Sequence, residues 1–175
     1  MSSASLQDAL FEVETVLSDD MGYRGPVASN AAGITYRQLD YWARTGLVVP
    51  EIRSAEGSGT QRLYSFRDIL LLKVVKRLLD AGITLQQIRT AVTHLRERGV
   101  DDLTSVTLMS DGLSVYECTS DNEVIDLLRG GQGMFAIALG GVWHDIESTL
   151  GELPTQRAQD GMDELAKRRA AKLAV

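Results

Sequence analysis

Two large hydrophobic residues, Leu39 and Trp42, set the first clear helical spacing in the chain. They are three positions apart, so on a helix they share one face that can pack inward. Arg37, Tyr41 and Arg44 follow one another at spacings of four and three, so they share a different face. The pattern therefore predicts an amphipathic helix that buries one face and leaves another free for a partner.

A shorter helix is expected directly before it, over the segment from Val27 to Gly33. Pro26 suits the first turn of a helix, and Gly33 allows a sharp corner after it. Thr35 then suits the N-cap of the following helix. Two helices joined at such a corner form a helix-turn-helix (HTH), in which the second helix can enter the major groove of DNA.

A basic loop and two further amphipathic helices complete the unit. The loop contains two glycines, Gly57 and Gly59, with Arg53 before them and Arg62 after them. The order of these parts predicts a winged HTH within residues 24–99. The residues expected to hold its scaffold are Leu39, Trp42, Leu47, Phe66, Ile69, Leu72, Val75, Leu78, Leu85 and Ile88.

Charge is distributed unevenly along the chain. Residues 24–99 hold 12 Lys and Arg against 6 Asp and Glu, residues 1–23 hold none against 5, and residues 100–175 hold 6 against 13. These nets of +6, −5 and −7 sum to the whole-chain net charge of −6. Positive charge confined to one segment is the electrostatic footprint of a DNA-binding domain, even in an acidic chain.

Four short motifs follow one another across the segment from Val27 to Leu95. They are an aromatic pair, a Gly-Leu pair, an Arg-x-Tyr signature and a Gly-x-x-Leu-x-x-Ile junction, formed by Tyr41, Trp42, Gly46, Leu47, Arg62, Tyr64, Gly82, Leu85 and Ile88. In this order they resemble the DNA-binding domain of MerR-type transcription regulators. In detail the chain is similar to a group of actinobacterial MerR-like regulators linked to growth and cell division.

The resemblance implies a DNA-binding face made of the second helix and the wing. Arginine can pair bidentately with guanine, and glutamine with adenine, in the major groove. The residues predicted to contact bases are Thr35, Tyr36, Arg37 and Gln38. The residues predicted to contact phosphates or to form the wing contacts are Tyr41, Arg44, Arg53, Arg62 and Tyr64.

The chain departs from the family in three places, one of which is Ala43, where a glutamate would follow the aromatic pair. Many members carry arginine where this chain has Asp40, so Arg37 or Arg44 is expected to replace that contact. Members usually dimerise through a long coiled-coil helix after the DNA-binding module. Here the helix predicted over residues 84–98 runs into Gly99 and then into strand-like sequence, so no such coil is expected.

Beyond residue 99 the pattern changes to a mixture of strands and helices. A Ser-Asp-Gly turn predicts a hairpin of Val106–Met109 with Leu113–Cys118. Asn122–Leu128 has helical spacing and ends at a glycine pair. Met134–Leu139 alternates as a third strand would, followed by a helix from Val142, although a single longer helix also fits.

The fold class predicted from these elements is mainly α, with a MerR-like winged HTH domain followed by a small α+β domain. The boundaries are residues 24–99 for the first and residues 100–153 for the second. Residues 1–23 form an acidic segment, predicted to be mobile; its apolar stripe of Leu6, Leu10, Val13 and Leu17 leaves a docking helix as the alternative. Residues 154–175 are predicted to be a solvated tail, with phosphate contacts by its basic run at 167–169 as the alternative.

The small α+β domain is expected to supply dimerisation, effector binding or both. Dimer contacts are placed in it because no coiled coil follows the HTH. A domain of this size is not expected to bury its whole apolar stripe alone. The residues predicted for the dimer interface are Phe135, Val142, Trp143 and Ile146.

Metal binding and catalysis are not indicated. The two histidines, His94 and His144, and the one cysteine, Cys118, have no ligand-like spacing, whereas metal-sensing MerR relatives use cysteine clusters. Cys118 is expected to be a small packed hydrophobe on a strand. No constellation of acids, bases or nucleophiles suggests an enzyme, so neither a metal nor another cofactor is predicted.

The apolar runs of the chain all fall well short of the ~20 residues of a membrane span, which predicts a cytoplasmic protein. We expect a transcription regulator that binds an inverted-repeat promoter site on double-stranded DNA as a homodimer, with RNA polymerase as a further partner. The alternative is a protein-interaction adaptor with a MerR-like fold that has lost DNA binding. The retained Arg37, Arg53 and Arg62 argue against that alternative.

Overall fold

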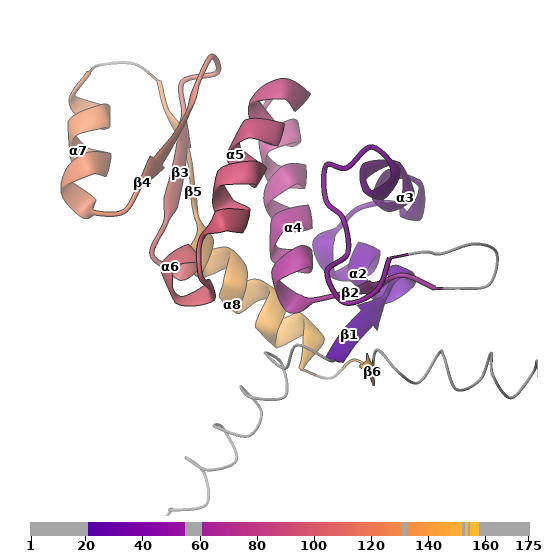
Figure 1. Cartoon of the computed structure of the whole chain (residues 1–175). Coiled ribbons are helices and arrows are strands. Elements are labelled where there is room, and N and C mark those ends of the chain that lie inside the picture. The colour runs from indigo at the N-terminus through magenta and orange to yellow at the C-terminus, as the bar shows by residue number, and fades with distance from the viewer. Residues whose placement is uncertain (1–20, 55–60, 131–132, 152, 154, 158–175) are drawn as a thin grey trace, which may run out of the picture.

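A computed structural model of the chain describes residues 21–54, 61–130, 133–151, 153 and 155–157. Within them the chain is mainly helical, as predicted, and two small sheets accompany the helices (Figure 1). The helices are α2 (Gly25–Ala32), α3 (Tyr36–Arg44), α4 (Phe66–Asp80), α5 (Leu85–Glu97), α6 (Val100–Thr104), α7 (Asp121–Arg129) and α8 (Leu139–Leu150). The strands are β1 (Met21–Arg24), β2 (Leu63–Tyr64), β3 (Thr107–Ser110), β4 (Val115–Cys118), β5 (Phe135–Ala138) and β6 (Gln156–Arg157).

The helix pair α2 and α3 forms as its end signals predict. Pro26 stands in the first turn of α2, and Gly33 closes the helix with a φ of 72°, a left-handed conformation that glycine adopts without strain. Thr35 caps α3 in a capping box with Gln38. Both helix ends are therefore fixed by local chemistry, and the predicted N-cap is confirmed.

Helix α4 occupies the centre of the molecule (Figure 1). Nine of its 15 residues are buried, because α2, α5 and α8 all pack against it. Arg67 in its first turn donates from Nη2 to the carbonyl oxygens of Leu95, Arg96 and Arg98, and so ties the start of α4 to the end of α5. A cation at this position also complements the negative end of the α5 dipole.

The predicted scaffold residues lie in the core with one exception. Leu39, Trp42, Leu47, Phe66, Ile69, Leu72, Val75, Leu78 and Ile88 are at most 3% exposed. Leu85 was expected among them and is 41% exposed. It is the first residue of α5, so it lies at a helix end on the surface rather than against α4.

The first sheet has the strand order β2-β1-β6 and corrects two predicted boundaries. Met21 pairs with Arg157 and Tyr23 with Tyr64, so both ends of the described chain join the fold. Residues 21–23 are therefore not part of a mobile segment, and residues 156–157 are not part of a solvated tail. The stripe at residues 6–17 and the basic run at 167–169 lie outside the described residues.

The second sheet has the order β4-β3-β5 and confirms the predicted hairpin. Its turn uses Asp111, whose carboxylate accepts from the backbone N–H groups of Leu113 and Ser114, and Gly112 with a φ of 88°. The predicted third strand forms as β5, antiparallel to β3. Two details differ: the stretch after Gly99 is the short helix α6, and α8 begins at Leu139 rather than at Val142.

Helix α8 packs into the same core as the HTH. Val142 and Ile146 are 0% exposed and belong to one hydrophobic cluster with residues of α2 and α4. Trp143 is half-buried, with its ring centroid 4.2 Å from that of Phe66. Residues on both sides of the predicted boundary between residues 99 and 100 therefore share one core. Val142 and Ile146 are buried in it and are not available to a dimer interface. Phe135 remains 39% exposed.

Gly140 allows α8 to approach α6 closely. A Cβ atom at this position would stand 2.7 Å from the carbonyl oxygen of Thr104, a backbone atom that cannot swing aside. At the neighbouring Gly141 a Cβ would meet no atom within 4 Å.

Within the described residues, no helix combines the length and the apolar character needed to cross a membrane.

Candidate nucleic-acid interface

Helix α3 presents a row of polar and aromatic side chains to solvent. Tyr36 is 59% and Tyr41 50% exposed, and the side chain of Arg44 is 65% exposed. Arg37 is exposed as well and has no hydrogen bond or ion pair among the described residues. The opposite face is fully anchored by Leu39 and Trp42, so the exposed face is held rigidly.

The first turn of α3 uses two of the predicted base-contacting residues for its own cap. The Gln38 N–H donates to Thr35 Oγ1 at 3.1 Å, and the Thr35 N–H donates to Gln38 Oε1 at 3.0 Å. The amide oxygen of Gln38 is thus engaged, while its NH₂ group is left to donate. A bidentate contact of Gln38 with adenine would require this capping box to open.

Asp40, which was not among the predicted site residues, links α3 to the basic loop. Its Oδ2 lies 2.9 Å from Arg44 Nη2, and its Oδ1 lies 2.7 Å from Arg62 Nη1. The hydrogen bond from Arg62, assisted by the charge of Arg44, lowers the pKa of the Asp40 carboxyl. The i,i+4 spacing of Asp40 and Arg44 was a sequence signal for half of this arrangement. The pairing with Arg62, 22 residues away, had none.

The loop that carries the remaining basic residues is closed at its base. Arg53 and Leu63 exchange two backbone hydrogen bonds, of 3.2 and 2.9 Å, and form an antiparallel bridge. The Arg53 side chain donates from Nε to the carbonyl oxygen of Gln61. Arg62 therefore stands beside α3 through its bridge to Asp40, and Arg53 is held at the base of the loop, while the loop tip with Gly57 and Gly59 lies outside the described residues.

Tyr64 does not reach the surface. Its side chain is 0% exposed, its hydroxyl has no hydrogen-bond partner among the described residues, and burial raises its pKa to about 12. The predicted contact of this side chain with DNA is therefore not available in the structure. The tyrosine instead pairs through its backbone with Tyr23 in the first sheet.

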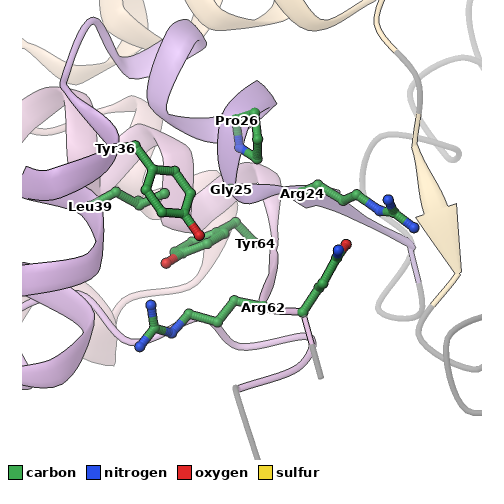
Figure 2. A pocket seen from close by; sticks show the side chains of 8 residues that line it. Arg24, Gly25, Pro26, Tyr36, Leu39, Arg62 and Tyr64 are labelled. Carbon is green, nitrogen blue, oxygen red and sulfur yellow. The ribbon is translucent and has the colours of Figure 1, made fainter. Parts of the chain in front are cut away.

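A cavity of about 300 Å³ lies between α3, the start of α2 and the basic loop (Figure 2). Its lining residues are Arg24, Gly25, Pro26, Tyr36, Leu39, Gln61, Arg62 and Tyr64. Tyr36 packs against Gly25, where a Cβ atom would stand 2.8 Å from the Tyr36 ring. Arg24 is exposed on the side of the cavity opposite Tyr36 and adds a cation that was not among the predicted site residues.

A second cavity, of about 410 Å³, lies between α5 and β4. Glu117 stands at its wall and accepts two hydrogen bonds from Arg98, of 3.1 and 2.9 Å, while His94 Nδ1 lies 3.5 Å from Glu117 Oε1.

Cys118 on β4 is 3% exposed, which confirms that it is packed, and burial raises the pKa of its thiol. Within the described residues, no cluster of three or more His, Cys, Asp or Glu could hold a metal.

Comparisons with known proteins agree with this geometry. Residues 23–95, which span α2 to α5, match the family model of the MerR HTH family regulatory protein. Uncharacterized HTH-type transcriptional regulators of Mycobacterium bovis and Mycobacterium tuberculosis are each 58% identical over 174 residues, covering 96% of this chain and 77% of theirs. The HTH-type transcriptional regulator HmrR of Sinorhizobium medicae is 29% identical over 83 residues, 46% of this chain and 54% of its own.

The family model covers the segment from α2 to α5, which includes α3 and its exposed row of side chains. The mycobacterial relatives align with almost the whole chain. The protein therefore belongs to the MerR family of HTH regulatory proteins.

Proposed function

We propose that this protein is a transcription regulator that binds a specific site on double-stranded DNA through α3 and the basic loop. The observation that carries the proposal is the exposed row of α3, in which Arg37 is unpaired among the described residues and lies beside Tyr41. An arginine in this position can reach guanine in the major groove. In this proposal the loop between Arg53 and Arg62 is the wing, and its arginines contact phosphates.

We further propose that the protein binds an inverted repeat as a homodimer. Two copies related by a two-fold axis would place their α3 helices about 34 Å apart, or further by whole helical turns, so that both meet major grooves on one side of the duplex. Outside the segment that carries α3, several large hydrophobic residues of the C-terminal half stay exposed, namely Leu113, Tyr116, Ile125, Leu128 and Phe135. These side chains, rather than the buried Val142 and Ile146, are the surface on which a second copy would pack.

Arg37→Ala is expected to weaken binding to the specific site by about 1 to 3 kcal/mol, and binding to random sequence far less. A duplex enriched from a random-sequence pool by the parent protein serves as the specific probe, and the unselected pool as the second probe. Fluorescence anisotropy titrations give the two affinities.

Arg129→Ala is the matched control, because it removes the same charge from the exposed end of α7, away from α3. It should bind both probes like the parent protein. If Arg37→Ala and Arg129→Ala were indistinguishable on the selected duplex, α3 would not be the reading element. A parent protein that enriches no sequence would favour the adaptor alternative.

A further inference from the structure

We infer that Asp40 is a specificity-determining residue of the α3 face: it positions Arg44 and Arg62 and weakens their attraction for the phosphates of any DNA sequence. The inference rests on the proposed function, because it assumes that α3 and the basic loop face DNA. It concerns an acidic residue at the place where a DNA-binding surface is expected to be basic.

One carboxylate holds two guanidinium groups from separate elements. Its two oxygens are divided between them, with Oδ2 at 2.9 Å from Arg44 and Oδ1 at 2.7 Å from Arg62. The Arg62 side chain is 20% exposed and that of Asp40 34%, so this pair is less screened by water than an ordinary surface ion pair. Asp40 thereby holds the half-buried Arg62 guanidinium in one direction, and it draws the exposed Arg44 toward it by the weaker i,i+4 pair.

The carboxylate stands in the middle of the exposed row. Tyr36, Asp40 and Arg44 are four residues apart and share one face of α3. Binding to DNA of random sequence depends on attraction between basic side chains and phosphates. A negative charge placed between two of those side chains reduces that attraction for every DNA sequence. A repulsive group of this kind improves discrimination when the specific sequence makes contacts that compensate for it and other sequences do not.

Both arginines can still contact DNA while Asp40 holds them. A guanidinium group has five N–H donors, and the bridges engage Nη2 of Arg44 and Nη1 of Arg62. The remaining donors have no partner among the described residues and can meet phosphates or bases whose positions match this geometry. Since the Arg62 side chain is already held, such a contact by Arg62 costs less entropy than one made by a mobile arginine. A correctly shaped site therefore loses little from Asp40, and other DNA loses more.

Asp40→Asn tests this inference because it keeps the size of the side chain and removes its charge. The probes are the duplex enriched by the parent protein and the unselected random-sequence pool, with affinities measured by anisotropy over a series of salt concentrations. Asp40→Asn is expected to bind the pool about three- to ten-fold more tightly, with a steeper salt dependence. Its ratio of selected to random affinity should fall by about the same factor. Asp40→Glu, which restores the charge, should return most of this ratio.

Asp145→Asn is the control for net charge. It breaks an Arg–Asp pair of 3.0 Å between α4 and α8 and changes the charge of the protein by the same amount. It should leave the affinity ratio at the parent value. An Asp40→Asn variant with the parent ratio, or a change that Asp145→Asn reproduces, would overturn the inference while the parent protein still binds DNA. Absence of DNA binding by the parent protein would overturn the proposed function, and the inference with it.

Discussion

Ile146→Ala is expected to lower the free energy of unfolding of the single chain by about 2 to 5 kcal/mol, because it leaves a cavity in a close-packed core. Ile146 is 0% exposed, and α8 packs against α4 and α2. Chemical denaturation followed by circular dichroism measures the loss. The variant should unfold at a lower denaturant concentration than the parent protein. If Ile146 lay in a dimer interface, the variant would instead remain folded and become a monomer.

Phe135→Ala is the matched control within the stripe predicted for the dimer interface. Phe135 is 39% exposed, so its truncation should change the stability of the single chain far less. If Ile146→Ala kept the parent stability and instead dissociated a dimer, Ile146 would be an interface residue and the packing of α8 on α4 would be wrong.

Asp68→Asn is expected to remove part of the pH dependence of stability. The Asp68 side chain is 0% exposed; its Oδ2 accepts from the N–H groups of Glu51 and Ser65, whereas Oδ1 has no partner among the described residues. Burial raises the pKa of this carboxyl to about 6 from its ordinary 3.8, although the two backbone N–H groups lower it. An asparagine oxygen can keep both hydrogen bonds without carrying a charge.

The folded protein holds the Asp68 proton more tightly than the unfolded chain does. The stabilisation from this group is therefore fully present below the unfolded pKa of 3.8 and is lost as the pH rises through about 6. Between about pH 5 and about pH 7.5 the parent protein should lose about 1 to 2 kcal/mol relative to Asp68→Asn. Urea unfolding of both proteins at the two pH values measures this difference. An equal stability gap at both values would show that Asp68 does not titrate in this range.

The HTH could be predicted from the sequence because its signals are local. Thr35 at the N-cap, Gly33 at the corner and the spacing of Leu39 and Trp42 each act within a few residues. The hairpin of β3 and β4 was equally accessible, since Asp111 and Gly112 form its turn by themselves. Elements of this kind need no knowledge of the distant chain.

Sequence predictions fail where a residue pattern does not identify the surface against which it packs. The apolar stripe of α8 looks the same whether it faces a second copy or α4, and the structure gives it to α4. The pairing of residues 156–157 with Met21 and Gly22 joins two segments that are far apart in the sequence and share no local signal. Tyr64 matches a family motif, yet its place in the first sheet buries its side chain.

The candidate site was predictable in its residues but less so in its electrostatics. The exposed row of α3 follows from helical periodicity, and Arg62 from the composition of the loop. The bridge that Asp40 forms between Arg44 and Arg62 depends on how the loop folds back onto α3, which is a tertiary property. Of the nine predicted contacts, the side chain of Tyr64 is buried and the amide oxygen of Gln38 is engaged in a cap.

Sedimentation velocity of the full chain, mixed with the duplex that it enriches from a random-sequence pool, tests the central claim most directly. The proposed function predicts two chains on each duplex, and an enriched sequence that reads as an inverted repeat with half-sites one or more whole helical turns apart. One chain on each duplex with an asymmetric sequence would contradict the homodimer. Failure to enrich any sequence would contradict DNA recognition itself.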